Sequence, residues 1–253
     1  MCTLTIHRSN RRLLVTMNRD EARTRGPEVP PQQWQGGVLL LAPRDSDQGG
    51  TWMALNEEGV VACLLNKYDD QRRIAALQPR ASYSSRGLII PEVLGHGPLH
   101  ACLAHLRETF QPHAYLPFTV AVAALEGVWS FTWHGEGPLE ETLHRAPWTM
   151  LSSSFFNTDE VLAWRLRAFE AWRGQGSPMR DGVPEFNLYQ PAGWEGWAPL
   201  MERDISATRS ITQAVIDADA PRHILRWSPV IGKAVSMTPY ALELPVEQGL
   251  LPS

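Results

Sequence analysis

Residues 1–21 read MCTLTIHRSNRRLLVTMNRDE, and this segment carries the strongest structural signal in the chain. Hydrophobic and polar residues alternate over residues 2–7, which is the period of a half-buried strand. Residues 8–11 have the composition of a turn, and a second apolar segment follows over residues 13–17. We therefore predict that the chain begins with an antiparallel hairpin whose second strand leads into Asn18-Arg19-Asp20-Glu21.

Cys2 is the residue of this hairpin with the clearest catalytic potential. It follows Met1, which is removed from chains whose second residue is small. The mature chain then begins with a thiol and a free α-amine, and a pKa of about 8 leaves part of that amine unprotonated near neutral pH. The amine can accept the thiol proton, so that one residue supplies both nucleophile and base. The simpler interpretation is that Cys2 only permits the removal of Met1, but its position beside residues 18–21 favours chemistry.

Arg19 and Asp20 are expected to lie beside Cys2. In an antiparallel hairpin, the end of the second strand is next to the start of the first. Arg19 would lower the pKa of the thiol, or hold a carboxylate or carbonyl group of a substrate. Asp20 would accept hydrogen bonds from the α-amine and orient it. The alternative is an ordinary surface turn of mixed charge, and the position opposite Cys2 favours the functional role.

The remainder of the chain predicts strands paired in hairpins and helices in separate blocks. Turns over residues 56–59 and 126–127 each separate two strands. A Pro-rich loop is expected over residues 26–37, and two short helices within residues 86–110. This pattern is typical of an antiparallel α+β fold, and because no linker is apparent we predict one domain over residues 1–253.

The clearest helix is predicted over residues 157–173. Asn157 or Thr158 can cap its N-terminus. An apolar face at helical spacing is expected from Leu162, Leu166 and Phe169.

Four short motifs resemble a known family when they are taken together. They are Met1-Cys2, Asn18-Arg19-Asp20-Glu21, Gly49-Gly50-Thr51-Trp52 and Asn56-Glu57-Glu58-Gly59. This set is similar to the NRDE family, whose animal representative is transport and Golgi organisation protein 2. That family in turn resembles the choloylglycine hydrolase and penicillin V acylase branch of the N-terminal-nucleophile (Ntn) hydrolases. The resemblance is strong over residues 1–66 and patchy afterwards, and it implies an αββα sandwich of antiparallel sheets between helix layers.

The resemblance also implies further site residues. Asn66 stands where the acylases carry an Asn whose side chain helps to form the oxyanion hole, and the alternative is an Asn that only ends a strand. Arg209 belongs to a segment similar to a late arginine motif and would line the same site. The stretch Leu151-Ser152-Ser153-Ser154 aligns with one where relatives usually show Asn, and Thr119 replaces an Asn common in the family, so we expect the substrate and the rate to differ. Arg209 and Ser153 are therefore candidate substrate-binding residues.

Composition and charge exclude several classes of function. The net charge is −4 and the basic residues are scattered, which argues against a nucleic-acid or anionic-membrane surface. No apolar segment approaches the roughly 20 residues that span a bilayer, and the N-terminus lacks the apolar stretch of a signal peptide. Three cysteines without a CxxC pair indicate neither a disulfide framework nor a cysteine zinc site, so we expect a cytoplasmic protein.

No metal or cofactor is expected. His96 and His100 have a spacing that can bind a metal on a helix, but Gly97 and Pro98 between them disrupt a regular helix. Trp34, Trp194 and Trp197 lie in Gly- and Pro-rich loops and are candidates for the rim of an apolar pocket.

Two functions are compatible with these observations. The first is a cysteine amidohydrolase or acyltransferase acting on an amide or thioester of a small molecule, with Cys2 as nucleophile and Asn66 as oxyanion donor. The second is a non-catalytic carrier of haem or an acyl lipid on the same fold, because the resemblance also implies haem trafficking and lipid metabolism. A scaffold without a small ligand is the third. The oligomeric state stays open.

Overall fold

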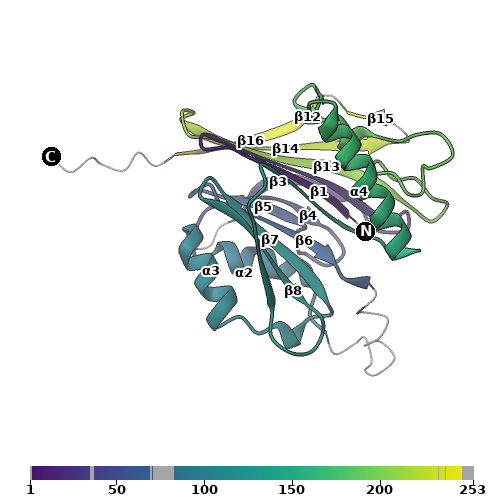
Figure 1. Cartoon of the computed structure of the whole chain (residues 1–253). Coiled ribbons are helices and arrows are strands. Elements are labelled where there is room, and N and C mark those ends of the chain that lie inside the picture. Colours follow the sequence, from purple (N-terminus) through teal and green to yellow (C-terminus); the bar gives the residue numbers. More distant parts are fainter. Residues whose placement is uncertain are drawn as a thin grey trace.

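The computed structural model describes residues 2–34, 37–68, 70, 83–232, 234–236 and 238–246. Two antiparallel seven-stranded sheets pack face to face, and helices cover their outer faces (Figure 1). The order of the layers is helix, sheet, sheet, helix, so the expected αββα sandwich is confirmed.

The first sheet contains the N-terminal hairpin. Its strand order is β10-β1-β2-β13-β14-β15, and β16 also pairs with β14. The strands are β1 (Cys2–Arg8), β2 (Arg12–Ala22), β10 (Trp148–Ser153), β13 (Ser206–Asp217), β14 (Arg222–Ile231), β15 (Ala234–Val235) and β16 (Tyr240–Pro245). Because β10 and β13 flank the hairpin, β1 and β2 are internal strands of the sheet.

The second sheet follows the chain order from β3 to β9. Its strands are β3 (Glu28–Trp34), β4 (Leu40–Asp45), β5 (Met53–Asn56), β6 (Val61–Asn66), β7 (Phe118–Ala124), β8 (Gly127–Trp133) and β9 (Glu140–His144). The predicted hairpins around residues 56–59 and 126–127 are confirmed as β5–β6 and β7–β8.

Helices lie on both outer faces of the sandwich (Figure 1). Within the described residues, the α-helices are α2 (Ile89–Leu94), α3 (Leu99–Glu108) and α4 (Thr158–Gly174). Single-turn 3-10 helices and a small two-stranded sheet complete the structure: η2 (Arg86–Leu88), η3 (Pro112–Ala114), η4 (Glu185–Leu188), β11 (Met179–Arg180) and β12 (Val183–Pro184). The two short helices expected within residues 86–110 are therefore confirmed as α2 and α3.

Apolar side chains fill the spaces between the layers. Leu4, Met17 and Leu55 belong to the core between the two sheets. Val93 and Phe118 belong to the core under α2 and α3. Burial of such side chains contributes roughly 1.5–3 kcal/mol each, so the alternating pattern of residues 2–7 fixes which face of β1 turns toward the second sheet.

Strand β3 is the main departure from the sequence prediction, which expected a Pro-rich loop over residues 26–37. It lies at the edge of the second sheet and pairs with β4. The register shifts between Val29 and Gln32, around Pro30 and Pro31. A proline lacks the N–H that a central strand needs, but it is tolerated at an edge or a bulge. Composition therefore favours a loop here, while pairing with β4 produces a strand.

Helix α4 spans nearly the predicted residues but buries a different face. Leu166 is 50% exposed, so the prediction that it belongs to the buried face is wrong. Asn157 occupies the N-cap position with a φ of 42°, and its side chain makes no capping hydrogen bond. The buried residues are Val161, Arg165, Phe169 and Trp172. The buried face therefore includes a charged side chain that the periodicity of Leu and Phe does not indicate.

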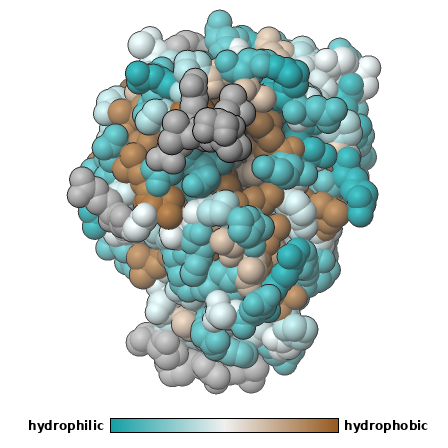
Figure 2. All heavy atoms as spheres, turned by 90° about the vertical axis from the view of Figure 1, so that its left-hand side faces the viewer, coloured by the Kyte–Doolittle hydropathy of each residue, from teal (hydrophilic) through white to brown (hydrophobic). Residues whose placement is uncertain are grey.

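Hydrophilic residues cover much of the surface. Figure 2 shows one face on which they surround several separate groups of hydrophobic residues. Within the described part of the chain, no helix is long and apolar enough to cross a membrane.

Candidate functional site

The register of the first sheet places Cys2 between two predicted site residues. Cys2 is paired with Arg19 on β2 and with Ser153 on β10. The expectation that the end of the second strand lies beside Cys2 is therefore confirmed.

The backbone of Cys2 is held from the β10 side. Its nitrogen donates a hydrogen bond of 3.1 Å to Oγ of Ser153. Its carbonyl oxygen accepts one of 3.2 Å from the hydroxyl of Ser152. In a chain that begins at Cys2, this nitrogen is the α-amine, so Ser153 is in position to orient the proposed base.

Burial raises the pKa of the Cys2 thiol. The positive N-terminus, a hydrogen bond from the backbone of Asp20 and the charge of Arg19 act in the opposite direction, while the carboxylate of Asp20 adds to the increase. The resting side chain is thus a thiol that must give up its proton when it reacts, rather than a preformed thiolate.

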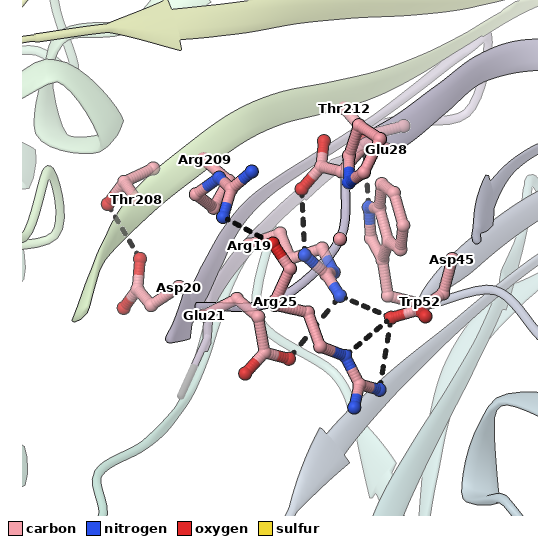
Figure 3. Close-up of polar contacts among 12 residues, drawn as sticks. Arg19, Asp20, Glu21, Arg25, Glu28, Asp45, Trp52, Thr208, Arg209 and Thr212 are labelled. Atoms are coloured by element: carbon pink, nitrogen blue, oxygen red, sulfur yellow. Dashed lines mark hydrogen bonds and ion pairs between the residues drawn. The ribbon is translucent and has the colours of Figure 1, made fainter. Parts of the chain in front are cut away.

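Arg19 lies in a cluster of carboxylates (Figure 3). Its terminal nitrogens are 2.9 Å from Glu28, 2.6 Å from Asp45 and 3.3 Å from Glu21. Its guanidinium carbon also lies 4.5 Å from the centre of the Trp52 ring, a cation–π distance. Burial disfavours the charge of Arg19, but Glu28, Glu21 and Asp45 together raise its pKa. Its contacts here are to protein carboxylates, which tie β2 to β3 and β4.

Asp20 is buried, and its residue partner on the neighbouring strand β13 is Thr208. Its Oδ1 accepts a hydrogen bond of 2.6 Å from Thr208, and its Oδ2 lies 3.7 Å from the guanidinium of Arg165. Burial raises the pKa of Asp20, and Arg165, the N-terminus and Thr208 partly oppose the increase.

Arg209 is the extra residue of a β-bulge in β13. The pairing with β2 shifts register between Thr208 and Ser210, which places Arg209 outside the ladder. Its guanidinium donates to the carbonyl oxygens of Ala22 at 3.2 Å and Arg25 at 3.4 Å. It therefore holds the segment after β2 in place.

A cavity of about 420 Å³ opens at Cys2. Four of the predicted site residues line it: Cys2, Arg19, Asp20 and Asn66. Ser153 and Arg209 are not among its described lining residues. Ser153 instead accepts a hydrogen bond from the backbone nitrogen of Cys2. Asn66 ends β6 and donates a hydrogen bond of 2.8 Å to the hydroxyl of Tyr68.

Several parts of the lining were not predicted from the sequence, and two of them carry arginines. One is the segment Tyr83-Ser84-Ser85-Arg86-Gly87, which forms another part of the wall. The other is Arg25, whose guanidinium lies 3.2 Å from Asp45 (Figure 3). Both come from polar stretches without periodic pattern, so only the tertiary fold brings them to Cys2.

The cavity lining is amphoteric. Its described cations are Arg19, Arg25 and Arg86, and its acidic residues are Asp20, Glu21 and Asp45. Trp52, Leu64 and Leu116 are the apolar part. Trp34, Trp194 and Trp197, the candidates for the rim of an apolar pocket, are not among the described lining residues of this cavity. The lining suits a small polar ligand with a limited apolar portion.

The motif at residues 49–52 shapes one wall of the cavity. A Cβ atom on Gly50 would lie 2.6 Å from the backbone carbon of Gly87, closer than real contacts allow. The N–H of Thr51 donates a 3.0 Å hydrogen bond to the carbonyl of Gly87. Glycine at position 50 therefore lets the segment before β5 pack directly against the segment before α2.

The motif at residues 56–59 is structural. Asn56 is fully buried, and its side chain donates to the carbonyls of Leu94 and Gly97 and accepts from the N–H of Val60. Gly59 has a φ of 74°, which glycine adopts without strain. This turn fixes the start of β6, and hence the position of Asn66 at its other end.

The described residues contain no group of three or more His, Cys, Asp or Glu side chains that could hold a metal ion. Of the described cavity residues, Cys2 with its thiol and Tyr83 with its phenol have atoms that can ligate haem iron.

The fold of this protein is similar to that of solved Ntn hydrolases. An N-acylethanolamine-hydrolyzing acid amidase orthologue from Caenorhabditis elegans is similar, with a TM-score of 0.57, 11% identity, and coverage of 87% of this chain and 94% of the other. The C2A mutant of the conjugated bile acid hydrolase from Clostridium perfringens has a TM-score of 0.51 at 10% identity, with coverage of 96% and 92%. At these identities the similarity establishes the fold alone.

The chain belongs to the Transport and Golgi organisation 2 family, whose model matches residues 1–170. This confirms the NRDE resemblance. No curated protein matches the chain in sequence.

Proposed function

We propose that this protein is an N-terminal-cysteine amidohydrolase or acyltransferase that acts on an amide or thioester of a small molecule. The observation that carries the proposal is the position of Cys2, which lies at a cavity of about 420 Å³ with its backbone nitrogen hydrogen-bonded to Ser153. A nucleophile, an adjacent base and a group that orients the base are the parts that covalent catalysis requires.

The reaction begins once Met1 has been removed. The Cys2 sulfur attacks the carbonyl carbon of the substrate, and the thiol proton passes to the α-amine as the carbon–sulfur bond forms. The protonated amine then gives its proton to the leaving amine or thiol, which departs as the carbonyl re-forms. Water attacks the resulting thioester to release an acid and the free thiol, or an acceptor amine or alcohol takes the acyl group instead.

Asn66 and Asp20 assist the two charged species in this sequence. The Asn66 amide lines the cavity and can donate to the oxyanion of the tetrahedral intermediate. Asp20 lines the cavity with Cys2, and its charge would favour the protonated form of the α-amine.

The similar structures support this choice of reaction. One of them is named as an amidase that hydrolyses N-acylethanolamines and the other as a hydrolase of conjugated bile acids. The amphoteric lining favours a substrate that is more polar than a long acyl chain. The three cysteines are all free, which suits a reducing compartment, and we place the protein in the cytoplasm.

A substrate panel tests the proposal and separates it from a carrier. Protein from its native host is first checked by intact mass for the loss of Met1, because an acylated amine cannot act as base. N-acyl amides and acyl-thioesters are then assayed for product release, and haem is assayed for binding. We expect turnover of at least one acyl compound, and a loss of turnover in both C2S and C2A.

Haem binding that depends on Cys2, with no acyl compound turned over, would instead establish a carrier. Full retention of Met1 would exclude the proposed mechanism. The control variant is Gln175→Ala, which is expected to behave as wild type because Gln175 is exposed at the C-terminal end of α4. A buried position such as Asn187, which is hydrogen-bonded to Asn18, would not serve as a control.

A further inference from the structure

Arg165 is a fully buried arginine on the inner face of α4. Its Nε and one terminal nitrogen donate to the carbonyl oxygens of Trp197 at 2.7 Å and Ala198 at 3.0 Å. These bonds anchor the guanidinium in a fixed orientation. A buried charge is expensive unless it is paired and hydrogen-bonded, and an apolar residue often replaces such a group without loss of stability.

The other terminal nitrogen of Arg165 reaches the strands on both sides of Cys2. It donates at 2.8 Å to Oγ1 of Thr3 on β1 and at 2.8 Å to Oγ of Ser152 on β10. It also lies 3.4 Å from the carbonyl oxygen of Ser153. Ser152 in turn donates its hydroxyl proton to the carbonyl of Cys2. Arg165 is therefore one hydrogen-bonded residue away from the backbone of Cys2.

The same guanidinium also lies close to Asp20. The distance between the Arg165 nitrogen and Oδ2 of Asp20 is 3.7 Å, and both side chains are fully buried. Burial raises the pKa of Asp20, and Arg165 is the strongest influence that lowers it. The N-terminus, Arg203, Cys2 and the hydroxyl of Thr208 are the other charged, titratable or polar groups that act on this carboxylate.

We infer that Arg165 is a positioning residue of the Cys2 site: it fixes the backbone of Cys2 through Ser152 and Thr3, and it holds the carboxylate of Asp20 in place next to Cys2. Its role in catalysis rests on the proposed function, whereas its effect on Asp20 and Cys2 does not. Arg165 touches neither the cavity nor the reacting atoms, so it acts through its neighbours.

Two variants separate the charge of Arg165 from its hydrogen bonds. R165M removes both, and R165K keeps the charge but has no planar fork to reach Thr3, Ser152 and the two carbonyls together. R173M, at an exposed arginine on the same helix paired with Glu170, is the matched control. Each protein is first checked for folding, and the rate of Cys2 alkylation is then followed from about pH 5.5 to 9.5 by peptide mass mapping.

Removal of the Arg165 charge in R165M should raise the pKa of Asp20 further. Since ionisation of Asp20 raises the pKa of Cys2, the alkylation profile of R165M should shift relative to those of the wild type and R173M. The double variant D20N, R165M should lack this shift when it is compared with D20N, since neither has a carboxylate at position 20. An unchanged profile in R165M, or a shift that persists with D20N, overturns the inference.

R165K should keep the wild-type pH profile and lose at least about tenfold in turnover of the acyl substrate, because the geometry around Cys2 relaxes. This variant decides the case if R165M does not fold, and wild-type turnover in R165K would contradict the positioning role. If no acyl compound is turned over by the wild type while the R165M profile changes as expected, the proposed function fails and the Arg165–Asp20 coupling stands.

Discussion

The backbone nitrogen of Cys2 lies 3.1 Å from Oγ of Ser153, which stands directly opposite it on β10. In the processed chain this hydroxyl is in position to orient the α-amine as a neutral hydrogen-bond acceptor. Because Ser153 is not among the described lining residues of the cavity, we expect its hydroxyl to influence the reaction through the amine.

We expect S153A to lower kcat about fivefold, since one neutral hydrogen bond contributes about 1 kcal/mol. The KM should change little because Ser153 is not a described lining residue of the cavity. Steady-state kinetics on the substrate found by the panel measures both. Ser236 makes its side-chain hydrogen bond within its own turn, to Thr238, and S236A is the control. Equal kcat values for S153A and wild type would show that the hydroxyl does not orient the base.

Cys2 should react with iodoacetamide faster than either of the other cysteines. Cys63 and Cys102 are buried, and burial raises the pKa of both, that of Cys102 to about 11. Burial also raises the pKa of Cys2, but Cys2 lines the cavity and is accessible to a small reagent. Peptide mass mapping near pH 8 gives the three rates. Labelling of Cys63 or Cys102 in the folded protein at the rate of Cys2 would contradict the cavity position.

Removal of the Asn66 amide should act on the transition state. We expect N66A to reduce kcat by roughly 10²-fold, as for other oxyanion donors, with KM nearly unchanged. Y68F removes the hydroxyl that Asn66 contacts and should cost far less, since that hydroxyl is not proposed to meet the oxyanion. A variant N66A with normal kcat and a raised KM would assign Asn66 to substrate binding instead.

The contact between Gly50 and Gly87 should make residue 50 intolerant of a side chain. In G50A the new Cβ meets backbone atoms of Gly87, which cannot move as a flexible side chain would, and we expect a loss of about 1–3 kcal/mol in the free energy of unfolding. A Cβ at Gly37 meets no heavy atom within 4 Å, so G37A is the matched control. Urea denaturation compares them, and equal midpoints for the two variants would refute the packing argument.

His223 should make the protein less stable as the pH falls. Burial lowers the pKa of His223 below its ordinary value of 6.5, so the unfolded chain takes up a proton more readily than the folded one. Its contribution to stability is complete above pH 6.5 and declines as the pH drops toward the folded pKa. The free energy of unfolding between pH 7.5 and 5.5 should therefore fall less in H223N than in the wild type. Parallel pH dependences would show that His223 is not responsible.

The parts of the site that could be predicted from the sequence are those that depend on local pattern. The alternation of residues 2–7 and the turn after them predict the hairpin, and its antiparallel geometry predicts the pairing of Cys2 with Arg19. The position of Asn66 came from the resemblance, and the structure places it in the cavity lining. One domain over residues 1–253 stays a prediction.

Contacts between distant segments could not be predicted in this way. Arg165 lies on α4, 163 residues after Cys2 by sequence number, and its burial becomes apparent only when α4 packs on the first sheet. The sequence does contain an indication that Arg165 is buried, because it stands four residues from both Val161 and Phe169 and therefore shares their helical face. Two of the carboxylates around Arg19, those of Glu28 and Asp45, likewise come from β3 and β4, and the Pro-rich composition of β3 did not indicate that these strands pair.

The prolines of β3 also bear on how copies of this chain avoid one another. A sheet edge with free N–H groups is a template on which another molecule can add a strand. Pro30 and Pro31 offer no such groups along one edge of the second sheet, and the opposite edge, β9, carries the exposed acidic residues Glu140 and Glu141. Both margins of the sheet thus resist intermolecular strand addition, and replacing the two prolines would be expected to expose the chain to aggregation from concentrated solution.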